Sequence, residues 1–288
     1  MNWTERRERF RKILEGPRCV HPGSVYDAIS ARIAEDLGFE VGMFAGSIGS
    51  MSVLGAPDLI VLTLTEFAAQ AYRICRAGNL ALLVDADHGY GNALNVKRTV
   101  GELETAGVSA LTIEDTVLPR PYGPSGKPTL ISVEEGVGKM KAALAGRQDK
   151  NLVVAGRTSA LAISGVEEAV VRAKAYEAAG VDAMFLAGAK SRAEVAAVAE
   201  AIRIPLFLGG AGGELGDKEW LGAHNVKIAL QGHQPFSAAV QAVYSTLKAL
   251  REGTPPGQLT GIASPDLMKQ VTREADYRQS TNDFLAGS

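Results

Sequence analysis

The sequence predicts an α/β protein, and within that class a (β/α)8 barrel with a C-terminal helical extension. Its 288 residues match the usual length of one eight-fold βα barrel with modest additions. Hydrophobic residues make up 46% of the chain and aromatic residues only 6%, a composition typical of buried parallel strands covered by helices. In addition, helical patterns that end at glycine are followed at once by short apolar runs, and this unit recurs along the chain.

The recurring unit is clearest at residues 37–39, 106–108 and 179–181. In each case glycine suits the left-handed position just after a helix, and the apolar run that follows it predicts a buried parallel strand. Eight strands that alternate with helices fit a closed barrel better than an open sheet. We expect these strands at residues 18–22, 40–46, 80–86, 109–114, 152–157, 182–187, 204–209 and 226–231.

The composition divides the chain into a catalytic barrel domain at residues 1–252 and a linker with a helical extension at residues 253–288. Residues 253–263 are rich in Gly, Pro and Thr, which predicts a linker. Ser264 and Pro265 then suit a helix start, as cap and first-turn residue. The extension either folds back on its own barrel or is lent to a neighbouring subunit, and the residues alone leave both open.

Charge and composition exclude several classes of partner. The net charge of −2, with both signs interspersed, indicates no nucleic-acid footprint and no membrane-surface patch. No apolar run reaches the roughly 18 residues that a membrane span needs, so we expect a cytoplasmic protein with a small-molecule substrate. Cys19 and Cys75 are far apart in the sequence, which predicts reduced packing residues rather than a disulfide or a zinc site.

Acidic side chains follow two neighbouring strands at the point where each strand ends, which is where βα-barrel active sites form. Asp85 and Asp87 lie two residues apart after one strand, so strand geometry points them the same way. Glu114 and Asp115 end the next strand. Close carboxylates repel each other unless a cation or a shared proton relieves them, and hard oxygen ligands suit Mg²⁺. A solvated turn is the alternative, but the second acidic strand end favours a metal site.

Three further polar side chains follow predicted strands. The planar guanidinium of Arg157 suits the carboxylate of an anionic substrate, and the alternative is a structural ion pair with a neighbouring acid. Ser47 lies in a turn of small residues where backbone amides can approach a ligand. His233 could bind a carboxylate, move a proton or serve only the structure. The stretch 209–213 is rich in glycine but lacks the Lys-Ser/Thr ending of a phosphate loop, so we interpret it as a wall of the site.

Several motifs that contain these residues resemble the isocitrate lyase and phosphoenolpyruvate mutase superfamily, and within it the oxaloacetate decarboxylase group. The resemblance covers nearly the whole chain. Its most specific parts are residues 22–32, the segment from Pro57-Asp58 to Thr65-Glu66, Asp85-Ala-Asp-His-Gly-Tyr-Gly-Asn92, Thr112-Ile-Glu-Asp115 and Gly156-Arg157-Thr158. The resemblance implies a barrel whose C-terminal helices are swapped between subunits of a homodimer or homotetramer.

The resemblance also implies the roles of the candidate residues. Asp85 would hold Mg²⁺ directly, with Mn²⁺ as a substitute, and Asp87 and Glu114 would hold its waters. Ser47 and Arg157 would bind the 2-oxo carboxylate end of the substrate, and His233 would contact the distal carboxylate. The expected catalytic residues are His233 and Arg157. The implied reaction is the decarboxylation of oxaloacetate, or a close 2-oxo diacid, to pyruvate and CO₂ through a metal-bound enolate, which makes the chain a carboxy-lyase.

Departures from the superfamily pattern narrow the choice of reaction. Lyases that act on isocitrate-like acids carry a Cys in the loop after the fourth strand, and here Tyr122 takes that position. The Asn-containing loop of the phosphonate mutase is not evident. Ala211 lies where some decarboxylase-like members have Tyr, which leaves the far end of the substrate open. A carbon-carbon lyase or oxaloacetate hydrolase of the superfamily and a non-catalytic 2-oxo acid binder remain alternatives, and water, Tyr122 and His233 remain candidates for the proton donor.

Overall fold

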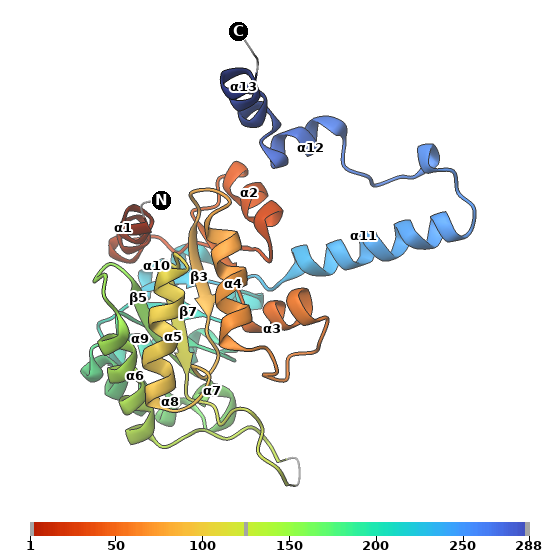
Figure 1. Cartoon of the computed structure of the whole chain (residues 1–288). Helices are drawn as coiled ribbons and strands as arrows, with labels where there is room; N and C mark the ends of the chain where they lie inside the picture. Colours follow the sequence, from red (N-terminus) through yellow and green to blue (C-terminus); the bar gives the residue numbers. More distant parts are fainter. Residues whose placement is uncertain (1–2, 124–125, 286–288) are drawn as a thin grey trace. The chain divides into compact units, whose positions relative to one another are not determined.

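The computed structural model describes residues 3–123 and 126–285. Eight parallel strands lie side by side in chain order, with helices between them (Figure 1). The strands are β1 Gly23–Ser24, β2 Val41–Phe44, β3 Ala81–Asp85, β4 Ala110–Glu114, β5 Val153–Thr158, β6 Ala183–Leu186, β7 Leu206–Leu208 and β8 Val226–Ala229. This order confirms the predicted (β/α)8 architecture.

The sheet closes on itself through the segment just before β1. Val20 bridges Ile228 of β8 in parallel, and the backbone N–H of Val20 donates to the carbonyl of Lys227 at 2.9 Å. The first strand was expected at residues 18–22, but the regular strand begins only at Gly23. Pro22 explains the shift, because it has no backbone N–H to donate to a neighbouring strand.

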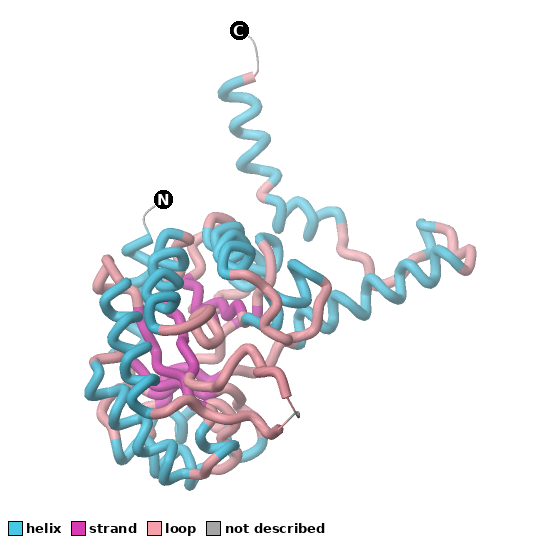
Figure 2. The backbone as a smooth tube through the Cα atoms, turned by 60° about the horizontal axis from the view of Figure 1, so that its bottom comes forward, coloured by secondary structure: helices cyan, strands magenta, loops and turns pink. Residues whose placement is uncertain are grey.

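Helices surround the strands of the barrel (Figure 2). The longer ones are α1 Trp3–Glu15, α2 Ala28–Asp36, α4 Leu64–Cys75, α5 Ala93–Thr105, α6 Val133–Gly146, α8 Val166–Ala179, α9 Arg192–Ala201 and α10 Lys218–Ala223. The shorter ones are α3 Gly46–Gly49, η1 Ser50–Leu54, α7 Ala160–Ile163 and η2 Gly213–Gly216. At the three junctions expected from the sequence, Gly38, Gly107 and Gly180 have φ of 81°, 93° and 99°. Glycine therefore supplies the left-handed conformation that turns each helix into the next strand.

The amino-terminal end of the barrel is covered by α1, which contacts β3 and β5. The ring of Phe10 lies edge-on to that of Phe207 with centroids 6.2 Å apart. Arg7 is also buried and donates to the backbone carbonyls of Glu104 and Val108. Because α1 covers the amino-terminal end, a ligand site has room at the carboxyl ends of the strands.

The chain divides into two compact units, Met1–His233 and Gln234–Ser288. The second contains α11 Gln234–Arg251, η3 Pro256–Gln258, α12 Pro265–Thr272 and α13 Glu274–Phe284. As expected, Ser264 caps α12, where its hydroxyl accepts from the backbone N–H of Leu267 at 3.2 Å. This division falls at the start of α11, whereas the sequence suggests a boundary at its end, after residue 252. The domain boundary at 252 therefore stays a prediction.

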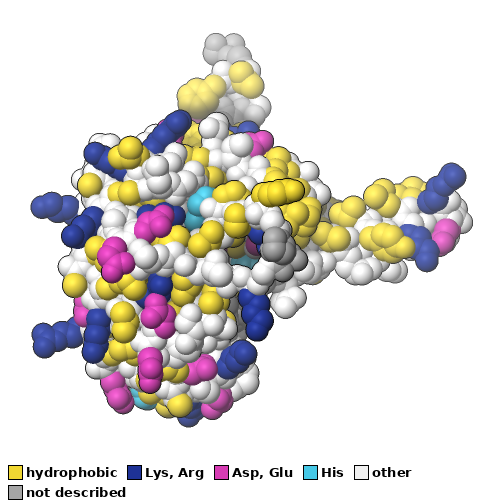
Figure 3. Space-filling model, turned by 90° about the horizontal axis from the view of Figure 1, so that it is seen from below, with side chains coloured by type: hydrophobic (Ala, Val, Ile, Leu, Met, Phe, Trp, Pro, Cys, Tyr) yellow, Lys and Arg dark blue, Asp and Glu magenta, His cyan; other side chains and the backbone are white. Residues whose placement is uncertain are grey.

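The surface agrees with the small net charge of the chain. On the face in Figure 3, acidic and basic side chains are interspersed rather than gathered into a field of one sign. Among the helices of the described residues, none is both long and apolar enough to cross a membrane.

Candidate active site

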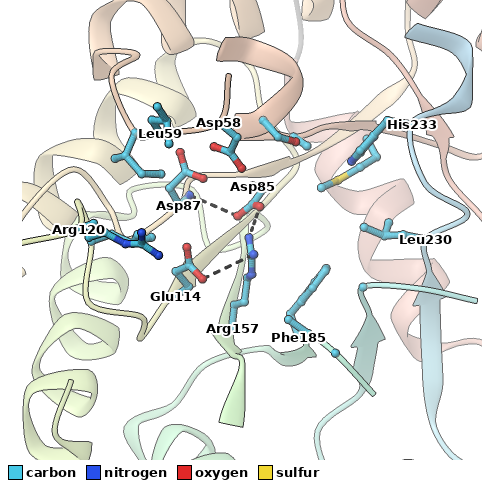
Figure 4. A pocket seen from close by; sticks show the side chains of 18 residues that line it. Asp58, Leu59, Asp85, Asp87, Glu114, Arg120, Arg157, Phe185, Leu230 and His233 are labelled. Carbon is cyan, nitrogen blue, oxygen red and sulfur yellow. Dashed lines mark hydrogen bonds and ion pairs between the residues drawn. The ribbon is translucent and has the colours of Figure 1, made fainter. Parts of the chain in front are cut away.

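A cavity of about 460 Å³ opens at the carboxyl ends of the barrel strands (Figure 4). It brings together all the site residues expected from the sequence. These are Ser47 after β2, Asp85 at the end of β3, Asp87 just after it, Glu114 on β4, Arg157 on β5 and His233 after β8. Their roles remain predictions, but their common location follows from the barrel, because parallel strands carry their last residues to the same rim.

Asp85 and Asp87 reach the cavity in different ways. Asp85 ends β3 and accepts a hydrogen bond from the hydroxyl of Thr112 at 2.9 Å. Asp87 lies beyond the strand, in a turn where its φ is 48°, a left-handed conformation that residues other than glycine rarely adopt. The side chain of Asp87 is therefore directed by this turn, and not by the strand alternation that was expected to point Asp85 and Asp87 the same way.

Gly46 makes room for the carboxylate of Asp87. A Cβ atom at this position would collide with both carboxylate oxygens of Asp87. We interpreted the small residues before Ser47 as a place where a ligand approaches the backbone. The structure adds a second reason for glycine here, because any larger residue would displace an acid of the site.

The acids of the cavity are crowded and poorly solvated. Burial raises the pKa of Asp87, and the neighbouring Asp85 and Glu114 raise it further. Burial also raises the pKa of Glu114, against the opposing effect of Arg157. The pKa of Asp58 is raised by burial and then by Asp85. Each shift shows that this group of carboxylates costs free energy when every member is charged.

Arg157 supplies positive charge to this group. One guanidinium nitrogen contacts Asp85, and another lies 3.5 Å from Glu114. Burial lowers the pKa of Arg157, but the carboxylates of Asp85 and Glu114 outweigh burial and raise it above its usual value. Its Nε atom is buried without a hydrogen-bond partner among the described residues. The ion pairs match the structural alternative considered for Arg157, and the residue nevertheless lines the cavity.

The donor set fits a hard divalent cation. Asp58, Asp85, Asp87 and Glu114 all line the cavity with carboxylate oxygens, the ligands that Mg²⁺ and Mn²⁺ prefer. Within the described part of the chain, no three such side chains form a complete ligand set by themselves. Mg²⁺ commonly uses one or two carboxylates and keeps several waters, so these residues fit it, and its charge would relieve the repulsion that raises their pKa values.

His233 lies across the cavity from Glu114 (Figure 4). The hydroxyl of Ser24 is 2.8 Å from its Nδ1 atom, which fixes the ring and leaves Nε2 for the cavity. Burial lowers the pKa of His233, although the charge of Asp85 opposes the shift. A neutral ring can donate one hydrogen bond from Nε2 when Ser24 donates to Nδ1.

Comparison with known proteins places this arrangement in a family. The model of the phosphoenolpyruvate phosphomutase family matches residues 10–251. The chain belongs to this family. It is 60% identical over 285 residues to an oxaloacetate decarboxylase of Bradyrhizobium diazoefficiens, with 99% of each chain covered. The superfamily and the decarboxylase group that the motifs resemble are thereby confirmed.

Solved structures of similar fold include enzymes of neighbouring chemistry. An oxaloacetate acetylhydrolase in complex with the inhibitor 3,3-difluorooxalacetate superposes with a TM-score of 0.86, at 27% identity and with 99% of each chain covered. A phosphonopyruvate hydrolase in complex with oxalate and Mg²⁺ gives a TM-score of 0.85 at 28% identity, covering 97% of this chain and 99% of that one.

Not every residue that lines the cavity lies at the end of a strand. Asp58 and Arg120 line the cavity from loops, and the Pro57-Asp58 motif was the available signal for the first. Tyr122 is fully exposed and does not line the cavity. At the end of β7, Gly209 lines the cavity and Ala211 does not, so the cavity wall there is backbone.

Proposed function

We propose that this chain catalyses the Mg²⁺-dependent decarboxylation of oxaloacetate to pyruvate and CO₂. One observation carries the proposal: an acid-lined cavity has Arg157 at one end and His233 at the other, in a chain 60% identical over nearly its full length to a protein named oxaloacetate decarboxylase. The two ends suit the two carboxylates of a four-carbon 2-oxo diacid, since each offers a donor to an anion.

Asp85 would hold the metal ion directly, and Asp87 and Glu114 would hold it through water. When bound, Mg²⁺ supplies a Lewis acid at the 2-oxo group. Arg157 would bind the adjacent C1 carboxylate, with the hydroxyl of Ser47 as a second donor. Held in this way, the substrate cannot rotate about its C1–C2 bond, and its reacting C3–C4 bond is directed toward His233.

His233 would bind the C4 carboxylate through Nε2, because Ser24 occupies Nδ1. Leu230 lines the cavity beside His233 and limits water there, whereas the ring of Phe185 lies against the guanidinium of Arg157. A carboxylate in such surroundings is less well solvated than in water, and its loss as neutral CO₂ moves the negative charge from C4 to the enolate oxygen at C2. No protein nucleophile is needed. Of the candidate donors to C3, water and His233 remain, because Tyr122 lies outside the cavity.

The direct test is turnover of oxaloacetate by the purified protein. With Mg²⁺ or Mn²⁺ we expect pyruvate and CO₂ to form faster than with the free metal, because positioning adds to Lewis acidity. Oxalate, a planar mimic of pyruvate enolate, should inhibit competitively. A rate equal to that of the metal alone would end the decarboxylase proposal.

Oxaloacetate hydrolysis is the second candidate, because a solved acetylhydrolase shares the fold and binds a fluorinated oxaloacetate. Hydrolysis would cleave the C2–C3 bond and give oxalate and acetate, whereas decarboxylation gives pyruvate and CO₂. NMR of the products therefore separates the two reactions. Oxaloacetate binding without any product would instead indicate a non-catalytic binder.

We further propose that the chain forms a homodimer or homotetramer and exchanges its C-terminal helices. Support comes from α11, where Val240, Val243, Tyr244 and Leu247 are all more than half exposed at spacings that place them on one helix face. Light scattering of wild type and Leu247→Glu tests this. A monomeric wild type would contradict it.

A further inference from the structure

The turn that carries Asp87 is tied down by two side chains from the surrounding helices. Nζ of Lys139, on α6, donates to the carbonyl of His88 at 2.9 Å. The hydroxyl of Thr99, on α5, donates to the carbonyl of Gly89 at 3.0 Å. Both side chains are buried, with exposed fractions of 3% for Lys139 and 0% for Thr99. Consecutive carbonyls of one turn are thus held from outside the barrel.

This turn needs external support because of its backbone. Asp87, Gly89 and Tyr90 have φ of 48°, 78° and 60°, and the left-handed region is costly for residues other than glycine. Such conformations persist only where the surroundings over-determine them. The carboxylate of Asp87 also faces other acids, so repulsion favours any movement that turns it away.

Burial of Lys139 costs more free energy than burial of a neutral side chain that could donate the same hydrogen bond to a carbonyl. A buried ammonium loses hydration that a neutral donor would not lose. Burial lowers the pKa of Lys139, while Glu135, Glu114 and Asp115 oppose that shift. The charge of Lys139 therefore interacts favourably with Glu114 of the cavity in addition to holding the turn.

We propose that Lys139 is a positioning residue of the metal site, which holds the turn after β3 so that Asp87 faces the cavity. The inference rests on the metal site of the proposed function. It does not require that the reaction be a decarboxylation.

Two effects of Lys139 on a bound cation have opposite signs, and this makes the proposal testable. The ammonium repels a nearby cation, so loss of its charge alone would tighten metal binding. Loss of the tie would release Asp87 and weaken binding, by about tenfold or more if it behaves as other supports of metal ligands do. The direction of the change in affinity therefore separates positioning from simple electrostatics.

The experiment measures Mn²⁺ affinity of the full chain by calorimetry or electron paramagnetic resonance, without substrate. We expect Lys139→Met to bind Mn²⁺ at least about tenfold more weakly than wild type, and Lys139→Gln to recover part of the loss because its amide can still donate. The matched control is Lys227→Met, since Lys227 is buried on β8 but does not line the cavity. It should lower thermal stability and leave Mn²⁺ affinity unchanged.

Unchanged or tighter Mn²⁺ binding by Lys139→Met would overturn the positioning role. A wild-type protein that binds no Mn²⁺ would instead contradict the metal site, and this proposal with it. If Lys139→Met fails to fold, Thr99→Val removes the neighbouring tie without a change of charge. Weaker Mn²⁺ binding by Thr99→Val supports the proposal, and wild-type affinity in Thr99→Val overturns it; Lys139→Gln keeps a donor and serves only as the conservative comparison.

Discussion

The two ends of the barrel are both crowded with charged side chains, but they treat those charges differently. At the amino end, Arg7 is buried and donates to the carbonyls of Val108 and Glu104, and it pairs with the carboxylate of Asp149 at 2.9 Å. At the carboxyl end, buried acids crowd around Arg157, whose Nε atom has no partner among the described residues.

The two ends differ in how the buried charges are balanced, not in whether every nitrogen has a partner. Each guanidinium nitrogen of Arg7 has a hydrogen-bond partner, although the Nε of Arg6 at the same end has none among the described residues, whereas the carboxyl end gathers acids whose pKa values are raised. A buried charge whose partners are all present contributes to the structure, and removal of one partner is costly. Acids held together with raised pKa values, as Asp87 and Glu114 are, store free energy that a cation can release. Variants at the two ends should therefore separate loss of activity from loss of stability.

The largest effect is expected for Asp85→Ala, which removes the direct ligand of the proposed metal. Activity should fall by about 10³-fold or more, since a Lewis acid worth several kcal/mol is lost and about 1.4 kcal/mol corresponds to a factor of ten. The fold should survive, because relief of the repulsion with Asp87 offsets the loss of the ion pair with Arg157. Oxaloacetate kinetics and thermal melting of the variant check both points. More than a tenth of wild-type turnover with EDTA present would contradict the metal assignment.

Arg7→Met should do the opposite at the amino end. It leaves Asp149 and the buried Glu104 without the guanidinium, and breaking a buried pair costs about 3 to 5 kcal/mol of the free energy of unfolding. Activity per folded molecule should be unchanged, because Arg7 lies at the far end of the strands. Urea unfolding and active-site titration with oxalate measure the two quantities. A stable Arg7→Met with reduced kcat would show that the two ends are coupled.

These contrasts also show which parts could be predicted from the sequence. Asp85, Glu114 and Arg157 were found because a barrel carries strand-end residues to one rim, a rule that needs only the order of the strands. Asp58 and Arg120 lie on loops, whose path depends on distant packing; the Pro57-Asp58 motif pointed to Asp58 by resemblance, and no pattern pointed to Arg120.

The packing of the amino end could not be predicted from the sequence either. Residues 1–10 have the composition of a charged, amphipathic segment with no apolar core, yet the structure buries Arg6, Arg7 and Phe10 of α1. The partners of Arg6 and Arg7 are carbonyls and carboxylates about 70 to 140 residues away along the chain, and Phe10 packs against the ring of Phe207. Such long-range pairing is a property of the closed barrel, and single-sequence periodicity cannot report it.

A smaller effect is expected for His233→Ala. Its proposed contact is with the distal carboxylate, and a hydrogen bond to a charged group contributes about 1.5 to 3 kcal/mol. The value of kcat/KM for oxaloacetate should therefore fall by about 10- to 150-fold. Oxalate binding should be nearly unchanged, because oxalate reaches only the metal and Arg157. A parallel loss of oxalate affinity, kinetics and melting temperature would make His233 a structural residue.

The smallest effect concerns the cysteines and tests how well the amino end is closed. Burial raises the pKa of Cys19 to about 11 and that of Cys75 to about 12, and only the thiolate is a good nucleophile. Neither thiol should react with iodoacetamide at pH 8 in the folded protein, and both should react in urea. Cys75 lies beside Arg6, whose guanidinium donates to its carbonyl. Arg7→Met should therefore speed labelling of Cys75, because it loosens α1, while Asp85→Ala should not; equal rates in the two variants would mean that α1 does not control access to this end of the barrel.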